Sequence, residues 1–237
     1  MKNFKTLLPS LIMFAIFSCK KDEVVHTAAP FYFYVPVDTG RWIIYDVDST
    51  YYDNFPPYIS DIYHYTYQVI ERIDSTFTDN AGRKTQRLVR ARRDSASAPW
   101  MIYNTIWFSN LSYSGYEKVE ENIRFVKLGF PITQTNSWNG NAYNFRGYDE
   151  YYYNGIHVPM SIASSFFDST ITVEHGLPPN VVEEKNGEES FANHIGMIYK
   201  KSTDIKFDTI PNHWSGSTFT YTIKNHGLHN APMPIVK

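Results

Sequence analysis

Cysteine, an excess of one charge and long apolar runs are all scarce in this chain, and each scarcity excludes a class of protein. The single cysteine, Cys19, excludes a fold held together by internal disulfides. Lysine and arginine number 22 against 24 aspartates and glutamates, which argues against nucleic acid as a partner. The apolar run at residues 7–17 is shorter than the roughly 20 residues that a membrane-spanning helix needs.

The chain also lacks the sequence signatures of common catalytic sites. No serine lies in a Gly-x-Ser-x-Gly elbow, and no Gly-rich phosphate loop or dinucleotide fingerprint is present. The neighbouring carboxylates at 149–150, 183–184 and 188–189 would face opposite ways on strands or lie solvated in loops. Among eight histidines only His226 and His229 are close, whereas a zinc site needs three or four ligands. We therefore expect no metal, no cofactor and no enzymatic activity.

The N-terminal residues have the three parts of a secretory signal. Lys2 and Lys5 supply the basic start, and residues 7–17 supply the apolar middle. The small Ser18 then stands directly before Cys19, where a signal peptidase would cut. This order predicts an exported protein.

Residues 16–19, Ile-Phe-Ser-Cys, resemble the lipobox at which bacterial lipoproteins are cut and acylated. The resemblance implies that residues 1–18 are a lipoprotein signal peptide. It also implies a diacylglycerol on the sulfur of Cys19 and a further acyl chain, such as palmitate, on its amine. Anchoring by more than one chain is stable, so the membrane is an expected partner.

Residues 20–23, Lys-Lys-Asp-Glu, resemble the charged stretch that follows the cysteine in lipoproteins of Bacteroidetes-type bacteria. In those proteins the stretch resembles a signal for export to the cell surface. The expected location is therefore the cell envelope, with the lipid anchor in the outer membrane and the domain either at the cell surface or in the periplasm.

Aromatic residues are abundant: they make up 17% of the chain, and tyrosine alone contributes 19 residues. Aromatic and β-branched side chains pack well on a pleated surface and favour strands. Residues 19–35 predict an acylated N-terminus and a tether. Residues 36–237 predict one all-β antiparallel domain, a barrel, half-barrel or sandwich with at most one or two short helices.

Alternating apolar and polar residues predict about ten strands. The clearest of them lie at 43–48, 62–77, 83–93, 100–108, 116–128, 162–173, 195–201 and 218–224. Residues 154–155, Asn-Gly, predict a turn, and residues 188–194 predict a short helix.

The segment from 62 to 93 predicts a hairpin with residues 79–82, Asp-Asn-Ala-Gly, as a four-residue loop. The predicted register pairs Thr78 with Arg83, Asp74 with Arg87 and Glu71 with Arg90. Two cross-strand pairs of opposite charge support it, at about 0.2–1 kcal/mol each. The basic second strand, 83–93, is either an anion site or a solvated strand that discourages edge pairing. Its arginines fall on both faces, which favours the second interpretation.

Three further segments carry a wider resemblance. Lipoproteins of unknown function from Bacteroidetes-type bacteria have segments similar to residues 40–45 (Gly-Arg-Trp-Ile-Ile-Tyr), to the Phe-Pro at 130–131 with Trp-Asn-Gly at 138–140, and to the Phe-Ala at 191–192 with Gly-Met-Ile-Tyr-Lys at 196–200. These segments span most of the mature chain and consist of structural residues. The resemblance implies no activity and no catalytic residue.

Five sites share an aspartate followed by a hydroxyl residue: Ser49, Ser75, Ser95, Ser169 and Thr209. They resemble the O-glycosylation sites of exported proteins from Bacteroidetes-type bacteria, and a surface glycan would add solubility. Alternatively, Asp-Ser and Asp-Thr pairs simply hydrogen-bond the backbone at turns and strand ends.

Four aromatic residues, Trp138, Tyr151, Tyr152 and Tyr153, are candidates for a ligand-binding platform. The expected function is a membrane-anchored, non-enzymatic binding or envelope-assembly module, with another envelope protein or a glycan as partner. The alternative is a carbohydrate-binding accessory lipoprotein, which those aromatic residues would favour if they lined one groove. A hydrolase is the weakest alternative because the sequence offers no catalytic constellation.

Overall fold

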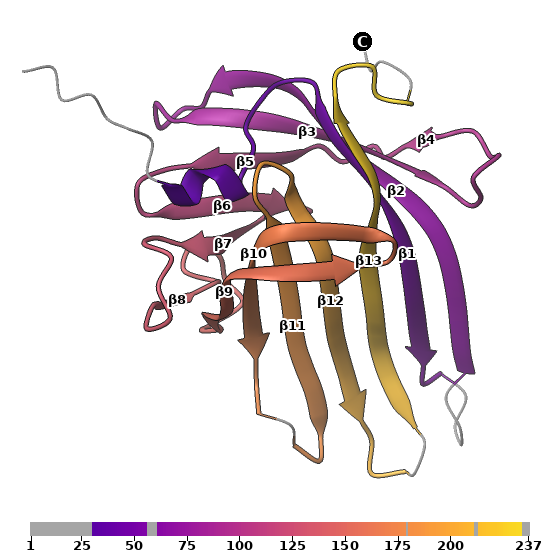
Figure 1. Cartoon of the computed structure of the whole chain (residues 1–237). Coiled ribbons are helices and arrows are strands. Elements are labelled where there is room, and N and C mark those ends of the chain that lie inside the picture. The colour runs from indigo at the N-terminus through magenta and orange to yellow at the C-terminus, as the bar shows by residue number, and fades with distance from the viewer. Residues whose placement is uncertain (1–29, 56–60, 179, 211–212, 234–237) are drawn as a thin grey trace, which may run out of the picture.

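The computed structural model describes residues 30–55, 61–178, 180–210 and 213–233. Cys19, the signal peptide and most of the predicted tether lie outside these ranges. Within them the chain forms one 3-10 helix and thirteen strands (Figure 1). No helix of the described residues has the length and apolar character to cross a bilayer.

The 3-10 helix η1 spans Pro30–Tyr34 and precedes all of the strands. The strands are β1 (Arg41–Asp53), β2 (Asp61–Thr78), β3 (Lys84–Arg93), β4 (Met101–Ile102), β5 (Trp107–Leu111), β6 (Gly115–Glu120), β7 (Ile123–Gly129), β8 (Ser137–Asn139), β9 (Glu150–Ile162), β10 (Ser165–Gly176), β11 (Glu183–Ala192), β12 (Gly196–Phe207) and β13 (Trp214–Leu228).

All thirteen strands belong to one antiparallel sheet, which confirms the predicted all-β class. The order is β7-β6-β5-β3-β2-β1-β13-β12-β11-β10-β9-β8, with β4 attached to β3. The sheet curls until its two ends meet. Two hydrogen bonds join these ends: Val126 donates its N–H to Gly140 O at 2.9 Å, and Trp138 donates Nε1–H to Val126 O at 2.8 Å. The domain is therefore a nearly closed barrel.

The N-terminal helix closes part of the barrel end. Tyr34 and Val35 are buried in a core cluster with Leu128 and Phe191. The Tyr34 hydroxyl is also 2.6 Å from Ser169 Oγ. The predicted boundary between tether and domain, after residue 35, thus falls inside a segment that packs on the barrel.

A second core cluster lies where the β9–β10 hairpin crosses the neighbouring strands (Figure 1). Phe167 of the hairpin packs with Val47, Val69 and Ile198. The hairpin therefore covers apolar side chains that the sheet alone would leave exposed to water.

The predicted hairpin of β2 and β3 exists, and its register is partly as expected. Glu71 pairs with Arg90, as predicted, but Thr78 pairs with Lys84 and not with Arg83. The loop is one residue longer because Asp79 N–H and Arg83 O close it with a 3.0 Å hydrogen bond. A register shift between Ile73 and Ser75 places Asp74 in a β-bulge, which removes the extra residue and restores the predicted register.

Asp74 no longer lies directly opposite Arg87, yet the two side chains form the predicted ion pair. Asp74 also accepts a 2.6 Å hydrogen bond from Arg72. The bulge thus changes the backbone partner of Asp74 and leaves its charge paired.

Three local predictions are wrong. Residues 188–194 are not a helix: they lie largely in β11, which pairs with β10 on one edge and β12 on the other. Asn154 and Gly155 lie inside β9 at a register shift, so this Asn-Gly pair makes a bulge and not a turn. The strand expected at 100–108 is two strands, β4 and β5, which both pair with β3.

Candidate functional site

The inside of the barrel carries seven charged side chains in one connected set, which we call the inner charged layer. Its members come from six strands and are Glu71, Arg90, Lys118, Glu120, Lys127, Glu189 and Lys200. None of these side chains is more than 15% exposed. Because buried charges are costly unless they are paired, their pairing decides whether the layer is tolerated.

One half of the layer centres on Glu71. Its Oε2 accepts a hydrogen bond from Lys118 Nζ at 2.8 Å, and its Oε1 lies 3.2 Å from Arg90 Nε. The Arg90 contact has the distance of an ion pair without hydrogen-bond alignment, so Nε is buried with no hydrogen bond in the described part of the chain. The guanidinium of Arg90 lies 3.5 Å from the centroid of the Trp107 ring, which adds a cation–π contact.

The other half is a square of two carboxylates and two ammonium groups. Lys127 Nζ lies 2.8 Å from Glu189 and 3.3 Å from Glu120. Lys200 Nζ lies 3.1 Å from Glu189 and 3.4 Å from Glu120. Lys118 joins the two halves, since its Nζ is 3.9 Å from Glu120. The layer is thus a continuous path of alternating charge.

These charges reach the interior because strand residues alternate between two faces. Tyr116, Lys118 and Glu120 are alternate residues of β6, and Phe125 and Lys127 are alternate residues of β7. Each strand therefore presents aromatic and charged side chains on the same inward face.

The pairing keeps the layer ionised. Burial acts to raise the pKa of Glu120 and Glu189, but the neighbouring ammonium groups outweigh it and hold both pKa values below the ordinary range. Burial acts to lower the pKa of Lys127 and Lys200, but Glu120 and Glu189 raise both above the ordinary value. At neutral pH all four groups are charged.

A cavity of about 380 Å³ lies on one side of the layer. Its walls include five aromatic side chains: Trp107, Phe125, Tyr151, Phe219 and Tyr221. A smaller, mainly apolar cavity of about 70 Å³ lies on the other side, against Tyr34 and Val35. Both cavities touch Glu71, Lys118, Glu120, Lys127 and Glu189, so the layer separates an apolar chamber from a larger mixed one.

One histidine–carboxylate pair also lines the large cavity. His175 Nδ1 lies 3.1 Å from Asp149 Oδ2, and the His175 ring stacks on Tyr151 at 4.1 Å between centroids. Burial raises the pKa of Tyr151, so its hydroxyl stays protonated and can donate a hydrogen bond.

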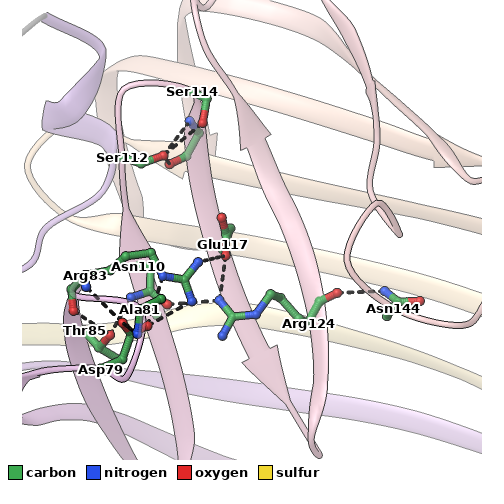
Figure 2. Close-up of polar contacts among 12 residues, drawn as sticks. Asp79, Ala81, Arg83, Thr85, Asn110, Ser112, Ser114, Glu117, Arg124 and Asn144 are labelled. Atoms are coloured by element: carbon green, nitrogen blue, oxygen red, sulfur yellow. Dashed lines mark hydrogen bonds and ion pairs between the residues drawn. The ribbon is translucent and has the colours of Figure 1, made fainter.

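A second polar set, which we call the outer network, lies on the opposite face of β3, β6 and β7 and on the adjoining β5 and β2–β3 loop (Figure 2). It comprises Asp79, Arg83, Thr85, Asn110, Glu117 and Arg124. Arg83 and Arg124 both reach Glu117, at 3.2 and 2.6 Å. The side chains of Arg83 and Arg124 are 39% and 27% exposed and that of Glu117 is 11% exposed, so water screens these two cations more than those of the inner charged layer.

The four aromatic residues predicted to bind a ligand do not share one groove. Tyr151 faces the large cavity, whereas Tyr152 lies on the outside, 43% exposed, and donates to Glu174 at 3.0 Å. Tyr153 is buried and donates its hydroxyl to Gly129 O at 2.8 Å. Trp138 packs against the Tyr153 ring and donates to Val126 O. Tyr153 and Trp138 thus hold the barrel closed.

The five predicted glycosylation sites lie in different settings. Ser95 and Thr209 are exposed outside the strands, while Ser49 and Ser75 are half-buried within β1 and β2. Ser169 lies in β10 and its Oγ contacts the Tyr34 hydroxyl. The two exposed sites are the accessible ones among the five.

The arginines of the basic strand β3 do not converge on one site. Arg90 enters the inner charged layer, Arg92 stacks on Tyr67 at 3.9 Å, and Arg93 stacks on Trp100 at 4.4 Å. Arg87 pairs with Asp74. Within the described ranges, no group of three or more metal-ligating side chains gathers.

Sequence patterns predicted the Glu71–Arg90 pair but missed the rest of the layer. Glu189 fell in a predicted helix, and Lys118 and Lys127 fell in strands with apolar residues on both faces. The signal that could have found these residues is a charged residue two positions from an apolar one, because the two then face the same side of the strand. Glu189 and Phe191 of β11 are such a pair. A charge in that setting is either buried and paired or marks the edge of the core.

Comparisons with known proteins give structural likeness only. No family model matches the chain, and no curated protein matches it in sequence. A Bacteroides fragilis protein described as exported, with a YmcC-like fold, aligns with a TM-score of 0.41 and 12% identity over 80% of this chain and 98% of its own. A Parabacteroides distasonis protein described as a lipoprotein aligns with a TM-score of 0.39 and 8% identity over 82% and 98%. At these scores neither likeness supports an inference about function.

Proposed function

We propose that this chain is an exported, lipid-anchored protein of the cell envelope whose barrel binds a small molecule in its large cavity. The observation that carries the proposal is the cavity itself: about 380 Å³, with paired charges at its floor and aromatic walls. Small-molecule sites occupy about 300–1,000 Å³ and combine apolar walls with a few placed polar groups. The lipid anchor on Cys19, in the outer membrane with the domain at the surface, belongs to the same proposal.

The ionisation of the inner charged layer supports binding over catalysis. A general acid or base works best with a pKa near the working pH. Glu120 and Glu189 have lowered pKa values, and Lys127 and Lys200 have raised ones, so none of these groups exchanges protons readily at neutral pH. Fixed charges of this kind orient a ligand, and we therefore propose a non-enzymatic role.

A matched pair of substitutions on β12 tests the binding function. Ser202 lines the cavity, whereas its neighbour Lys201 is exposed on the other face. The acylated protein is purified from its native membranes and examined by native mass spectrometry. We expect a small molecule bound to the unmodified chain and to Lys201→Phe, and its loss from Ser202→Phe, in which the added ring projects into the cavity and takes up part of the ligand's space. Equal ligand occupancy in both variants, or none in any, contradicts the proposal.

A separate experiment tests the anchor. Replacement of Cys19 by serine removes the acylation site, so Cys19→Ser should move from the membrane fraction to the soluble fraction. Ser18→Ala keeps a small residue before the cysteine and should remain in the membrane fraction. Recovery of Cys19→Ser in the membrane fraction would contradict the anchor. Surface exposure is tested separately, by protease treatment of whole cells.

A further inference from the structure

We infer that the ligand of the large cavity is a neutral saccharide of one or two sugar rings. The inference rests on the proposed binding function and narrows it to a substrate class. Three observations carry it: the charge balance of the lining, the unused hydrogen-bonding capacity of the floor, and the aromatic walls.

The lining is electrically balanced. Six cationic side chains and six carboxylates surround the cavity, with histidine counted as neutral. At the floor, each ammonium group lies within 3.4 Å of a carboxylate. A ligand with a net charge would leave that charge uncompensated beside the floor, where no side chain is more than 15% exposed, which is unfavourable. The balance therefore selects a neutral ligand.

The floor can still both donate and accept hydrogen bonds. An ammonium group has three donors and a carboxylate has about four acceptor positions, so two ion pairs do not saturate either. Lys127 and Lys200 both contact Oε1 of Glu189, which leaves Oε2 able to accept a hydrogen bond from a ligand hydroxyl. A hydroxyl group donates and accepts at once, and a surface of alternating charges suits a ligand with several hydroxyls.

The walls supply the apolar partner that a sugar ring also needs. Phe219 and Tyr221 of β13 meet at 78° with their centroids 5.7 Å apart, and both line the cavity beside the floor residue Lys200. Sugar rings have C–H faces that pack on aromatic rings while their hydroxyls point to polar groups. This combination distinguishes a saccharide from a phosphate, which carries a net charge, and from an acyl chain, which has no hydroxyl groups.

The volume limits the ligand to a short saccharide. At about 30 Å³ per water in the liquid, the cavity corresponds to about a dozen waters. That space holds one or two sugar rings. A free sugar and the end of a glycan chain offer the same hydroxyl groups and C–H faces to the cavity. Binding of mono-, di- and tetrasaccharides distinguishes these two sources.

Isothermal titration of the full acylated chain, in a detergent without a sugar headgroup, tests the inference. The probes are glucose, galactose, N-acetylglucosamine, maltose and cellobiose, with maltotetraose and cellotetraose as longer members. Glucuronate, glucosamine and glucose 6-phosphate are the charged counterparts. We expect one neutral sugar to bind, and its charged counterparts to bind about 10-fold more weakly or worse. A tetramer that binds no better than its dimer indicates a free saccharide, and one that binds better indicates a glycan end.

Two variants and one control sharpen the test. Phe219→Leu removes one of the five aromatic rings of the walls and should weaken sugar binding about 10-fold, while Tyr152→Leu on the outer surface should leave it unchanged. Asp204→Asn removes one carboxylate of the lining and should improve binding of glucuronate relative to glucose. Circular dichroism spectra that match the unmodified protein show that each variant is folded.

The outcomes separate this inference from the function on which it rests. If native mass spectrometry finds a ligand that Ser202→Phe loses, but that ligand is charged or is not a saccharide, the substrate class is wrong and the binding function stands. If glucuronate or glucose 6-phosphate binds more tightly than glucose, the charge argument is overturned. If the cavity is empty in the native protein and no probe binds, both proposals fail.

Discussion

The inner charged layer and the outer network are both built on ion pairs and share strands β3, β6 and β7, yet water reaches their cations very differently. On β6, Lys118 points into the barrel at 9% exposure, while its neighbour Glu117 belongs to the outer network and pairs with Arg83 and Arg124. The inner side chains are at most 15% exposed, and the outer arginines reach 39%. The Coulomb attraction within a pair and the cost of desolvating it both grow as water is excluded. Ion pairs with similar distances can therefore contribute differently to the free energy of unfolding.

The comparison makes the inner charged layer the place where one substitution does most harm. Glu120 lies within 4 Å of Lys118, Lys127 and Lys200. Glu120→Gln leaves three buried ammonium groups with too few carboxylates, and we expect a loss of about 3–5 kcal/mol in the free energy of unfolding. Urea denaturation followed by fluorescence measures it.

The matched control restores the charge balance. Lys127→Met added to Glu120→Gln removes one uncompensated ammonium group, so the double variant should be more stable than Glu120→Gln alone. If the single substitution costs less than about 1 kcal/mol, the inner layer behaves like a surface network and the comparison breaks down.

The sequence predicted the class of the fold because the main signals are local. Alternation marked the strands, and residues 79–82 marked the turn whose Gly82 has φ +76°. Errors arose where tertiary pairing overrode local preference. The segment 188–194 lies largely in β11 because strands on both sides hydrogen-bond to it, and no local pattern reports those neighbours.

The candidate site was less predictable because its residues meet only after the barrel closes. Glu71 and Arg90 share a hairpin, and their pairing follows from its register. Lys127 and Glu189 are 62 positions apart, on strands that are not neighbours in the sheet. Their contact depends on the curvature of the sheet, which the period of each strand does not encode. Trp138 was predicted to bind a ligand because it is aromatic, but its indole N–H donates to Val126 O and joins the two ends of the sheet.

Acid should destabilise the protein through the inner charged layer. Glu120 and Glu189 have folded-state pKa values below the ordinary value of 4.5. Their contribution is therefore fully present above about pH 4.5 and is lost as the pH falls through the lower folded-state values. We expect a loss on the order of 2–3 kcal/mol between pH 5 and pH 2, measured as the fall in Tm.

The same titration in Glu120→Gln supplies the control. This variant lacks one of the two titrating carboxylates, so its Tm should fall less steeply over that range. Identical slopes for the two proteins would assign the acid sensitivity to surface carboxylates. Lys127 also stabilises the folded protein, but with the opposite pH dependence because its pKa is raised. Its contribution is present below about pH 10.5 and is lost as the pH rises further.

A buried corner of the outer network should give an intermediate effect. Asn110 is 3% exposed, donates to Thr85 Oγ1 at 2.5 Å and accepts from Arg124 at 3.1 Å. Asn110→Ala leaves the buried hydroxyl of Thr85 without this partner, at a cost of about 1–3 kcal/mol by urea denaturation. The Thr85 hydroxyl still donates to Arg83 O at 3.2 Å, but adding Thr85→Val removes the oxygen that has lost its amide donor, so the double variant should recover part of the loss. Failure to recover would mean that packing, not hydrogen bonding, sets the cost.

Arg124 of the outer network is more exposed than any side chain of the inner charged layer, so its substitution should have the smallest effect and tests the comparison most directly. Arg124→Ala removes the 2.6 Å pair with Glu117, but Arg83 still contacts that carboxylate at 3.2 Å. Because water and salt screen these groups, we expect a loss of at most about 1 kcal/mol, and less in 1 M salt. The inner Glu120→Gln effect should change little with salt. A salt-insensitive loss above 2 kcal/mol for Arg124→Ala would show that the ion pairs of the outer network are as poorly screened as those of the inner charged layer.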